Sequence, residues 1–350
     1  MSADIVLRAE HLDVVYDGDR PTHAVRDVSF ELRRGELLGI AGESGCGKST
    51  LAYAVSRMLR PPARLAGGSV VFTGRDGRTV DLTALRGEEL RAFRWNKLSM
   101  VFQSAMNALN PVTTVGRQFD DIFRAHRPAM RAAERRRRAR ALLEMVGIDP
   151  ARVRSYPHEL SGGMRQRVVI AMALALEPEV VVMDEPTTAL DVVVQREILD
   201  EVERLREELG FSVVFITHDL SLLLEISDRL AVMYAGGIVE YAPADALAQA
   251  PAHPYTQGLL RSFPDLAGTR RELRGIPGTP PDLRQRLPGC PFAERCDQVV
   301  DRCRTERPVL RPVGSGHAAC HRHGGQPAPV AAVVPGESAL PERPYERRDP

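Results

Sequence analysis

The chain has 350 residues, of which 43% are hydrophobic and 27% charged, as is ordinary for a globular protein of about two domains. Its formal net charge of +1 gives no global field that would favour nucleic acid or an anionic surface. The basic run at residues 135–140 is interpreted as a solvated helix face. The longest apolar stretch, residues 168–176, is too short to cross a membrane, and the first residues do not read as an export signal. We therefore expect a soluble protein whose membrane role would need a partner.

Strand patterns alternate with helix patterns along most of the chain, which indicates an α/β core with a parallel sheet. The expected elements are a strand-pair region at 1–17, strands at 27–33, 37–41, 180–183 and 211–217, and helices from about 48 and at 190–209. In the second helix Ile198, Val202, Leu205 and Leu209 share one face, and Gly210 is expected to end it.

A glycine-rich loop follows the strand expected at 37–41. Residues 42–49, Gly-Glu-Ser-Gly-Cys-Gly-Lys-Ser, match G-x-x-x-x-G-K-[ST] between a strand and a helix. Backbone N–H groups of such a loop surround phosphate, and the helix N-terminus adds a positive dipole end. We expect Lys48 to reach the β and γ phosphates and Ser49 to ligate Mg²⁺. The other expected nucleotide contacts are Gly42, Ser44, Gly45, Cys46, Gly47 and Thr50, with Cys46 interpreted as a small filler.

Two carboxylates follow the apolar strand expected at 180–183. A strand end delivers Asp184 and Glu185 to the carboxyl edge of the sheet, where the phosphate loop also lies. Asp184 is expected to hold Mg²⁺, directly or through water, and Glu185 to act as general base for the attacking water. Such a base contributes on the order of 10²- to 10⁴-fold to the rate. The loop and the acid pair together predict a P-loop nucleotide hydrolase.

A third motif narrows the family. Residues 160–167, Leu-Ser-Gly-Gly-Met-Arg-Gln-Arg, resemble the signature motif of ATP-binding cassette (ABC) proteins and precede the acid pair as in that family. The resemblance covers about residues 5–260. It implies signature contacts to ATP from Ser161, Gly162 and Gly163.

Four further site residues are implied by the same resemblance. Gln103 corresponds to the glutamine that senses Mg²⁺ and the γ phosphate, and His218 to the switch histidine. Asp191, in residues 189–191, belongs to a loop that crosses to the partner subunit. Tyr16 is expected to stack on adenine.

The resemblance also implies a fold and a dimer. In this family the signature of one subunit closes over the phosphate loop of the other, with ATP between them, so the chain is expected to pair with a copy or a sister chain. The implied nucleotide-binding domain spans 1–265, with a RecA-like core, an antiparallel β-subdomain and an α-helical subdomain at about 104–176. A cysteine-containing C-terminal extension at 266–323 and a disordered tail at 324–350 are expected to follow.

Several segments are similar to the ATPases of dipeptide, oligopeptide and nickel importers in particular. They are 109–111, 164–167, 232–237, 253–260, 276–281 and 289–296. Ala105 and Val193 depart from that pattern, which has Pro and Thr there. The resemblance implies a peripheral ATPase at the cytoplasmic face of the cell membrane, using ATP and Mg²⁺. Its implied partners are two transmembrane permease subunits, a second ATPase subunit and, indirectly, an extracytoplasmic solute-binding protein.

Four of the five cysteines crowd into the last fifth of the chain, at Cys290, Cys296, Cys303 and Cys320. Their spacing lacks the C-x2-C pairs that zinc sites favour. Four thiolates can hold a [4Fe–4S] cluster, and the resemblance implies such a cluster in some members. Zinc, free thiols and a disulfide stay open, as do a structural and a redox-sensing role. The nearby His317, His321 and His323 are interpreted as exposed tail residues.

Two other functions are compatible with the motifs. A non-transport ABC ATPase acting on nucleic acid would bind it in a salt-sensitive way. The near-neutral charge and the lack of aromatic–basic interleaving count against it, so no nucleic-acid partner is expected. A non-catalytic scaffold would show no turnover that depends on Glu185.

Overall fold

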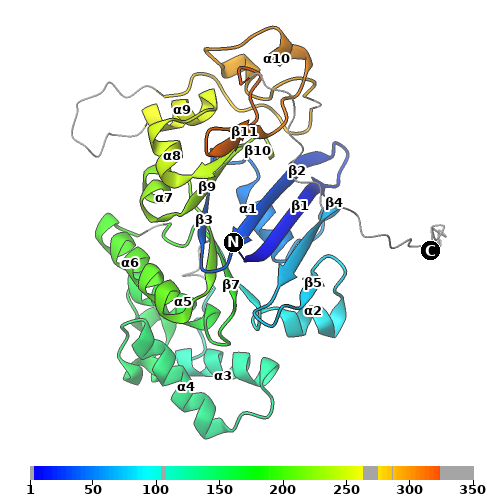
Figure 1. Cartoon of the computed structure of the whole chain (residues 1–350). Helices are drawn as coiled ribbons and strands as arrows, with labels where there is room; N and C mark the ends of the chain where they lie inside the picture. The colour runs from blue at the N-terminus through cyan, green and yellow to red at the C-terminus, as the bar shows by residue number, and fades with distance from the viewer. Residues whose placement is uncertain (1–3, 104–107, 189, 263–274, 286, 324–350) are drawn as a thin grey trace, which may run out of the picture.

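The computed structural model describes residues 4–103, 108–188, 190–262, 275–285 and 287–323 (Figure 1). Within these ranges the strands form two sheets, a four-stranded one of order β2-β1-β4-β5 and an eight-stranded one of order β11-β12-β10-β9-β3-β8-β7-β6. The strands are β1 (Ile5–Tyr16), β2 (Thr22–Arg33), β3 (Leu37–Ala41), β4 (Ala63–Thr73), β5 (Thr79–Asp81), β6 (Leu98–Val101), β7 (Val180–Asp184), β8 (Ser212–Ile216), β9 (Arg229–Tyr234), β10 (Gly237–Pro243), β11 (Arg311–Val313) and β12 (Gly316–Ala318). The α-helices are α1 (Lys48–Val55), α2 (Gly87–Phe93), α3 (Val115–His126), α4 (Ala132–Met145), α5 (Gly162–Ala173), α6 (Val192–Leu209), α7 (Leu220–Ile226), α8 (Ala244–Gln249), α9 (Pro254–Arg261) and α10 (Arg302–Thr305).

The centre of the larger sheet is parallel. Strand β3 pairs in parallel with β8 and β9, and β7 pairs in parallel with β8 and β6. Every residue of β3, β7 and β8 is buried, as expected for strands covered on both faces. The short apolar runs in the sequence therefore correspond to the innermost strands.

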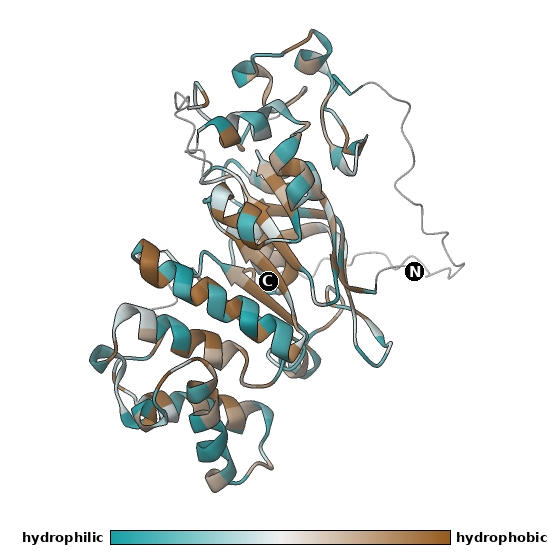
Figure 2. Ribbon diagram, turned by 60° about the vertical axis from the view of Figure 1, so that its left-hand side comes forward, coloured by the Kyte–Doolittle hydropathy of each residue, from teal (hydrophilic) through white to brown (hydrophobic). Residues whose placement is uncertain are grey.

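Two hydrophobic clusters lie on the two faces of this sheet, and alternate residues of each strand point into them. Val181 and Met183 of β7 join the cluster that contains the apolar faces of α3 to α6. Val180 and Val182 join the cluster that contains α1 and the antiparallel sheet. In Figure 2 the strands at the centre are mostly hydrophobic, whereas the long helix beside them carries many hydrophilic residues.

The helices α3 and α4 lie at one end of the molecule, and residues 290–320 lie at the other (Figure 1). In the described part of the chain, none of the helices combines the length and the apolar character that spanning a membrane requires.

One strand and the burial of two side chains differ from the sequence predictions. The expected strand pair at 1–17 is one strand, β1, whose register shifts mark bulges and which pairs with both β2 and β4. Leu209, the last residue of α6, is 38% exposed, whereas Ile198, Val202 and Leu205 on the same predicted face are buried. Arg135 is buried and not solvated, because its guanidinium pairs with Asp120 of α3 at 2.5 Å.

Several predictions fall on residues outside the described ranges. They are Ala105, Ala189, the expected domain boundaries near 104 and 265, and the tail at 324–350. The division into domains stays a prediction.

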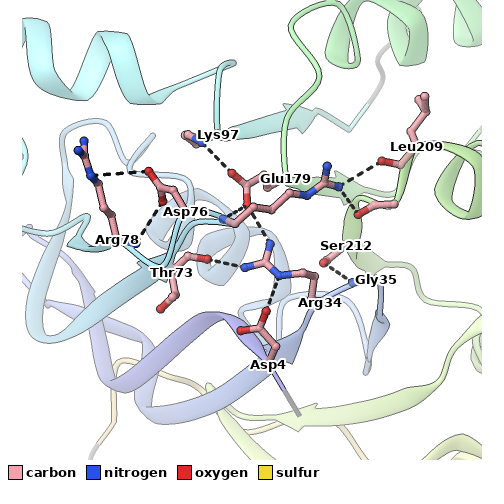
Figure 3. Close-up of polar contacts among 12 residues, drawn as sticks. Asp4, Arg34, Gly35, Thr73, Asp76, Arg78, Lys97, Glu179, Leu209 and Ser212 are labelled. Atoms are coloured by element: carbon pink, nitrogen blue, oxygen red, sulfur yellow. Dashed lines mark hydrogen bonds and ion pairs between the residues drawn. The ribbon is translucent and has the colours of Figure 1, made fainter.

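A buried carboxylate ties the amino-terminal ends of the central strands together (Figure 3). Glu179, next to β7, accepts hydrogen bonds from Arg34 Nη1 (2.8 Å), Lys97 Nζ (2.7 Å) and the Arg75 backbone N–H (2.8 Å). Burial alone would raise the pKa of Glu179, but these hydrogen bonds, that of Lys97 first, lower it. The carboxylate therefore stabilises the fold in its charged form.

We expect Glu179→Ala to lower the free energy of unfolding by about 2 kcal/mol, because Lys97 Nζ and Arg34 Nη1 lose this acceptor while Arg34 keeps Asp4 and the Thr73 carbonyl. This loss of unfolding free energy should be full at neutral pH and should shrink as the pH falls below about 4. A carboxylate with a lowered pKa stops contributing to stability once it is protonated. Urea denaturation at several pH values measures both effects. Glu208→Ala, which removes an ion pair from an exposed side chain on α6, is the control and should cost less than about 0.5 kcal/mol. Equal losses in the two variants would contradict the prediction.

Candidate functional site

The glycine-rich loop connects β3 to α1 at the carboxyl edge of the larger sheet. Gly42 and Gly47 have φ angles of +150° and +107°, which residues with a side chain rarely adopt. A methyl group at Gly42 would overlap the carbonyl oxygen of Met233, and one at Gly47 would overlap that of Ala24. Packing and backbone conformation both require glycine at these two positions.

The lysine of this loop is buried and folded back on the loop. Lys48 Nζ donates to the carbonyl oxygens of Gly42 (2.7 Å) and Glu43 (3.0 Å). The Cys46 thiol is also buried, and burial raises its pKa, which keeps it in the unreactive neutral form. The hydroxyl groups of Tyr16 and Thr50 lie 3.1 Å apart, which places the Tyr16 ring beside α1.

A serine hydroxyl and a buried carboxylate lie together next to this loop. Ser49 Oγ donates to Asp184 Oδ1 at 3.0 Å. The Asp184 side chain is fully buried, and its Oδ2 has no hydrogen-bond partner within the described ranges. Burial raises the pKa of Asp184, and the charge of Glu185 adds to the rise. An unpaired buried carboxylate oxygen beside a hydroxyl suits Mg²⁺, which binds oxygen ligands.

Glu185 is the centre of a second polar group. Its Oε2 accepts from Gln103 Nε2 (3.0 Å) and Thr188 Oγ1 (3.0 Å), and its Oε1 lies 3.4 Å from His218 Nδ1. The backbone of Glu185 has a φ angle of +47°, which is uncommon for a residue with a side chain. Backbone conformations of this kind are found most often at functional sites. The structure thus brings together three predicted residues from three separate segments. Thr188 was not predicted from the sequence. The only feature of the sequence that pointed to it is its position three residues after Glu185.

The signature and the loop after the acid pair occupy helix starts. Ser161 Oγ accepts from the Met164 backbone N–H at 3.2 Å and caps α5. Asp191 Oδ1 accepts from the Val194 N–H at 2.9 Å and caps α6. Gly163 packs closely against the side chain of Val194, so the two helix starts are adjacent. No hydrogen bond within the described ranges joins either cap to the phosphate loop.

The four cysteines of the C-terminal region are near one another. The Cys290 N–H donates to the Cys303 carbonyl at 2.7 Å. Burial raises the pKa of Cys290 to about 11, and its proximity to Cys303, Cys320 and Cys296 adds to the rise. No group of three or more His, Cys, Asp or Glu side chains in the described ranges is arranged to hold a metal ion. The metal-ligand set therefore stays a prediction.

The prediction of an exposed histidine tail is wrong for the three histidines near Cys320. All of them are half-buried. His317 belongs to β12, which joins the larger sheet through β10. His323 Nε2 lies 2.8 Å from the Ala252 carbonyl oxygen, and His321 Nε2 lies 2.8 Å from that of Glu306. Burial lowers the pKa of His317.

Comparison with known proteins identifies the family. A family profile for ABC transporters matches residues 25–188. A probable peptide ABC transporter ATP-binding protein of Sinorhizobium fredii is 45% identical over 322 residues, which cover 91% of this chain and 94% of that protein. The chain belongs to the ATP-binding cassette family of transporter ATPases. As an ABC ATPase it has the α/β P-loop cassette fold.

Two further comparisons concern the carboxyl-terminal part and the cassette itself. A profile for the C-terminal region of oligopeptide and dipeptide transporters matches residues 239–303. The dipeptide transport ATP-binding protein DppD of Bacillus subtilis is 44% identical over 302 residues, which cover 85% of this ABC protein and 88% of DppD. The ATP-binding cassette MJ0796, solved as a dimer in a post-hydrolysis state with ADP and Pi, aligns with a TM-score of 0.59 and 30% identity. The alignment covers 68% of this chain and 98% of MJ0796.

We expect Gly47→Ala to weaken ATP binding by about 100-fold, because the methyl group meets the Ala24 carbonyl and strains a left-handed residue. Titration with a fluorescent ATP analogue measures the change in Kd. Gly18→Ala, at an open position, is the matched control and should bind like the wild type. Normal affinity in Gly47→Ala would mean that the loop does not bind the phosphates in this conformation.

Proposed function

We propose that this ABC protein hydrolyses ATP to energise the uptake of dipeptides or oligopeptides through a membrane importer. The observation that carries the substrate class is the peptide-transporter profile at residues 239–303, which lies outside the part common to ABC ATPases. The relatives from Sinorhizobium fredii and Bacillus subtilis carry peptide and dipeptide transport in their names.

The geometry supports a role for each residue around the phosphate loop. Lys48 would leave the loop carbonyls and bind the β and γ phosphates of ATP. Ser49 and Asp184 would hold Mg²⁺, which neutralises phosphate charge when bound. Glu185 would take a proton from the attacking water, with Gln103 and His218 orienting its carboxylate.

The nucleotide site would be completed by a second ATPase subunit. Ser161 and Asp191 lie at the starts of α5 and α6 and have no hydrogen bond to the phosphate loop within the described ranges. They would instead meet the loop of a partner subunit, with ATP between the two. The similar cassette MJ0796 is a dimer in its structure with ADP and Pi, which supports this arrangement. Tyr16, beside α1, would stack on adenine.

We infer that the ATPase is peripheral and acts with two transmembrane permease subunits. Its activity in proteoliposomes with those permeases should rise when a peptide-loaded binding protein is added. Glu185→Gln should lower this turnover by about 10²- to 10⁴-fold, because the amide cannot take the proton, while ATP still binds. Phosphate release and ATP-analogue binding measure the two effects. Glu207→Gln, an exposed glutamate on α6, is the control and should turn over normally.

Two results would contradict the transport proposal. One is an ATPase rate that permeases and binding protein leave unchanged. The other is salt-sensitive binding of nucleic acid, which would favour the non-transport alternative.

We further propose that Cys290, Cys296, Cys303 and Cys320 hold a [4Fe–4S] cluster that stabilises the C-terminal extension. The four thiols lie within electrostatic range of one another, yet they are not arranged for a single metal ion in the described ranges. A cube-shaped cluster spans its ligands more widely than zinc does.

We expect anaerobically purified protein to contain about four iron atoms per chain and to show broad visible absorbance. Cys303→Ser should remove the absorbance and most of the iron. Cys46→Ser, in the phosphate loop, is the control and should keep both. Stoichiometric zinc, or absence of any metal after anaerobic purification, would contradict the cluster.

A further inference from the structure

The phosphate loop has a direct contact with the cysteine-containing region. Glu43, the second residue of the loop, pairs with Arg295, which is 252 positions later in the chain. Both ends of the guanidinium take part, since Nη1 donates to Oε2 at 2.7 Å and Nη2 to Oε1 at 2.9 Å. The Arg295 side chain is 6% exposed and that of Glu43 26%, so water screens the pair weakly.

The remaining N–H groups of Arg295 fix the orientation of the guanidinium. Nε donates to the Pro277 carbonyl at 2.8 Å, Nη2 to the Ile276 carbonyl at 3.3 Å, and Nη1 to the Tyr234 hydroxyl at 3.3 Å. The guanidinium also lies 5.8 Å from the ring centroid of Tyr234. An arginine held by several partners is a rigid anchor for a carboxylate.

The backbone of Glu43 is held as firmly as its side chain. Its N–H donates to the hydroxyl of Tyr255 at 2.9 Å, and Tyr255 is fully buried. Its carbonyl oxygen accepts from Lys48 Nζ at 3.0 Å and from the Cys46 N–H at 3.3 Å. One residue therefore connects Arg295 to the lysine expected to bind phosphate.

We propose that Arg295 is a positioning residue for ATP binding, which holds the phosphate loop in its binding conformation through Glu43. The proposal rests on the ATP-binding role proposed above for this loop. Arg295 itself does not touch the nucleotide. Through this contact the C-terminal extension supports the nucleotide site, by means of the residue that precedes Cys296.

The test separates ATP affinity from turnover. We expect Arg295→Ala to raise the KM for ATP and the Kd for a non-hydrolysable ATP analogue about tenfold, the effect of losing a charge-assisted pair. The kcat at saturating ATP should change by less than about twofold, because the residues around Glu185 are unaltered. Arg295→Lys should recover part of the affinity, since lysine keeps the charge and loses the two-pronged geometry.

Three comparisons decide the result. Glu43→Gln leaves the extension packed and should weaken ATP binding, as Arg295→Ala does. It therefore tests the proposal even if Arg295→Ala does not fold. The double variant Arg295→Ala, Glu43→Gln should be no weaker than the worse single variant, because the two residues act as one pair. Arg26→Ala removes hydrogen bonds to the Leu283 and Gln285 carbonyls of the extension without touching Glu43, and should bind ATP like the wild type.

Three results would each overturn the positioning role. The first is that the losses of ATP affinity add up in the double variant, and the second is that Arg26→Ala loses as much ATP affinity as Arg295→Ala. The third is that Glu43→Gln binds ATP as tightly as the wild type. Failure of the ATPase proposal looks different. In that case the wild type would not bind the analogue, or Lys48→Ala would bind it equally well, and both proposals would fall together.

Discussion

The parallel alignment of β3, β7 and β8 is the constraint on which the candidate site depends. The carboxyl ends of these neighbouring strands meet at one edge, so the phosphate loop, the acid pair and His218 arrive together although the sequence separates them widely. Both faces of each strand are buried, and a shift of one residue would exchange the side chains between the two hydrophobic clusters. Core packing therefore sets the register, and the register sets the distances around Glu185.

The sequence predicted the residues at this edge of the sheet because the motifs combine residue type with local context. The central strands appear as short apolar runs, and Gly210, with a φ angle of +67°, ends α6 as expected. The expectation that Gln103 and His218 belong to the site came from the family resemblance and not from periodicity, whereas their contacts with Glu185 appear only in the structure. Thr188 and Arg135 escaped prediction because their roles depend on a tertiary neighbour, Glu185 in one case and Asp120 in the other. No sequence pattern of single residues records such a neighbour.

The C-terminal region was the least predictable part for the same reason. The sequence predicted only a cysteine-containing extension, yet Phe292 packs against Tyr234 and Tyr255 and belongs to a main hydrophobic cluster. His253, held beside this group, has a pKa lowered to about 3, by burial first. The region is thus an integral part of the cassette's packing, attached beside the phosphate loop and away from α3 and α4 (Figure 1).

The strand pair at the end of the described chain also decides how the larger sheet terminates. β12 covers the free side of β10 through Glu240 and Tyr241, and β11 lies outside it. Pro312 in β11 has no N–H to offer, so the outermost strand is a poor template for another chain. A chain cut before residue 311 would present the bare backbone of β10 to its neighbours. Protection against edge-to-edge aggregation is thus built into the same segment that carries the last cysteine.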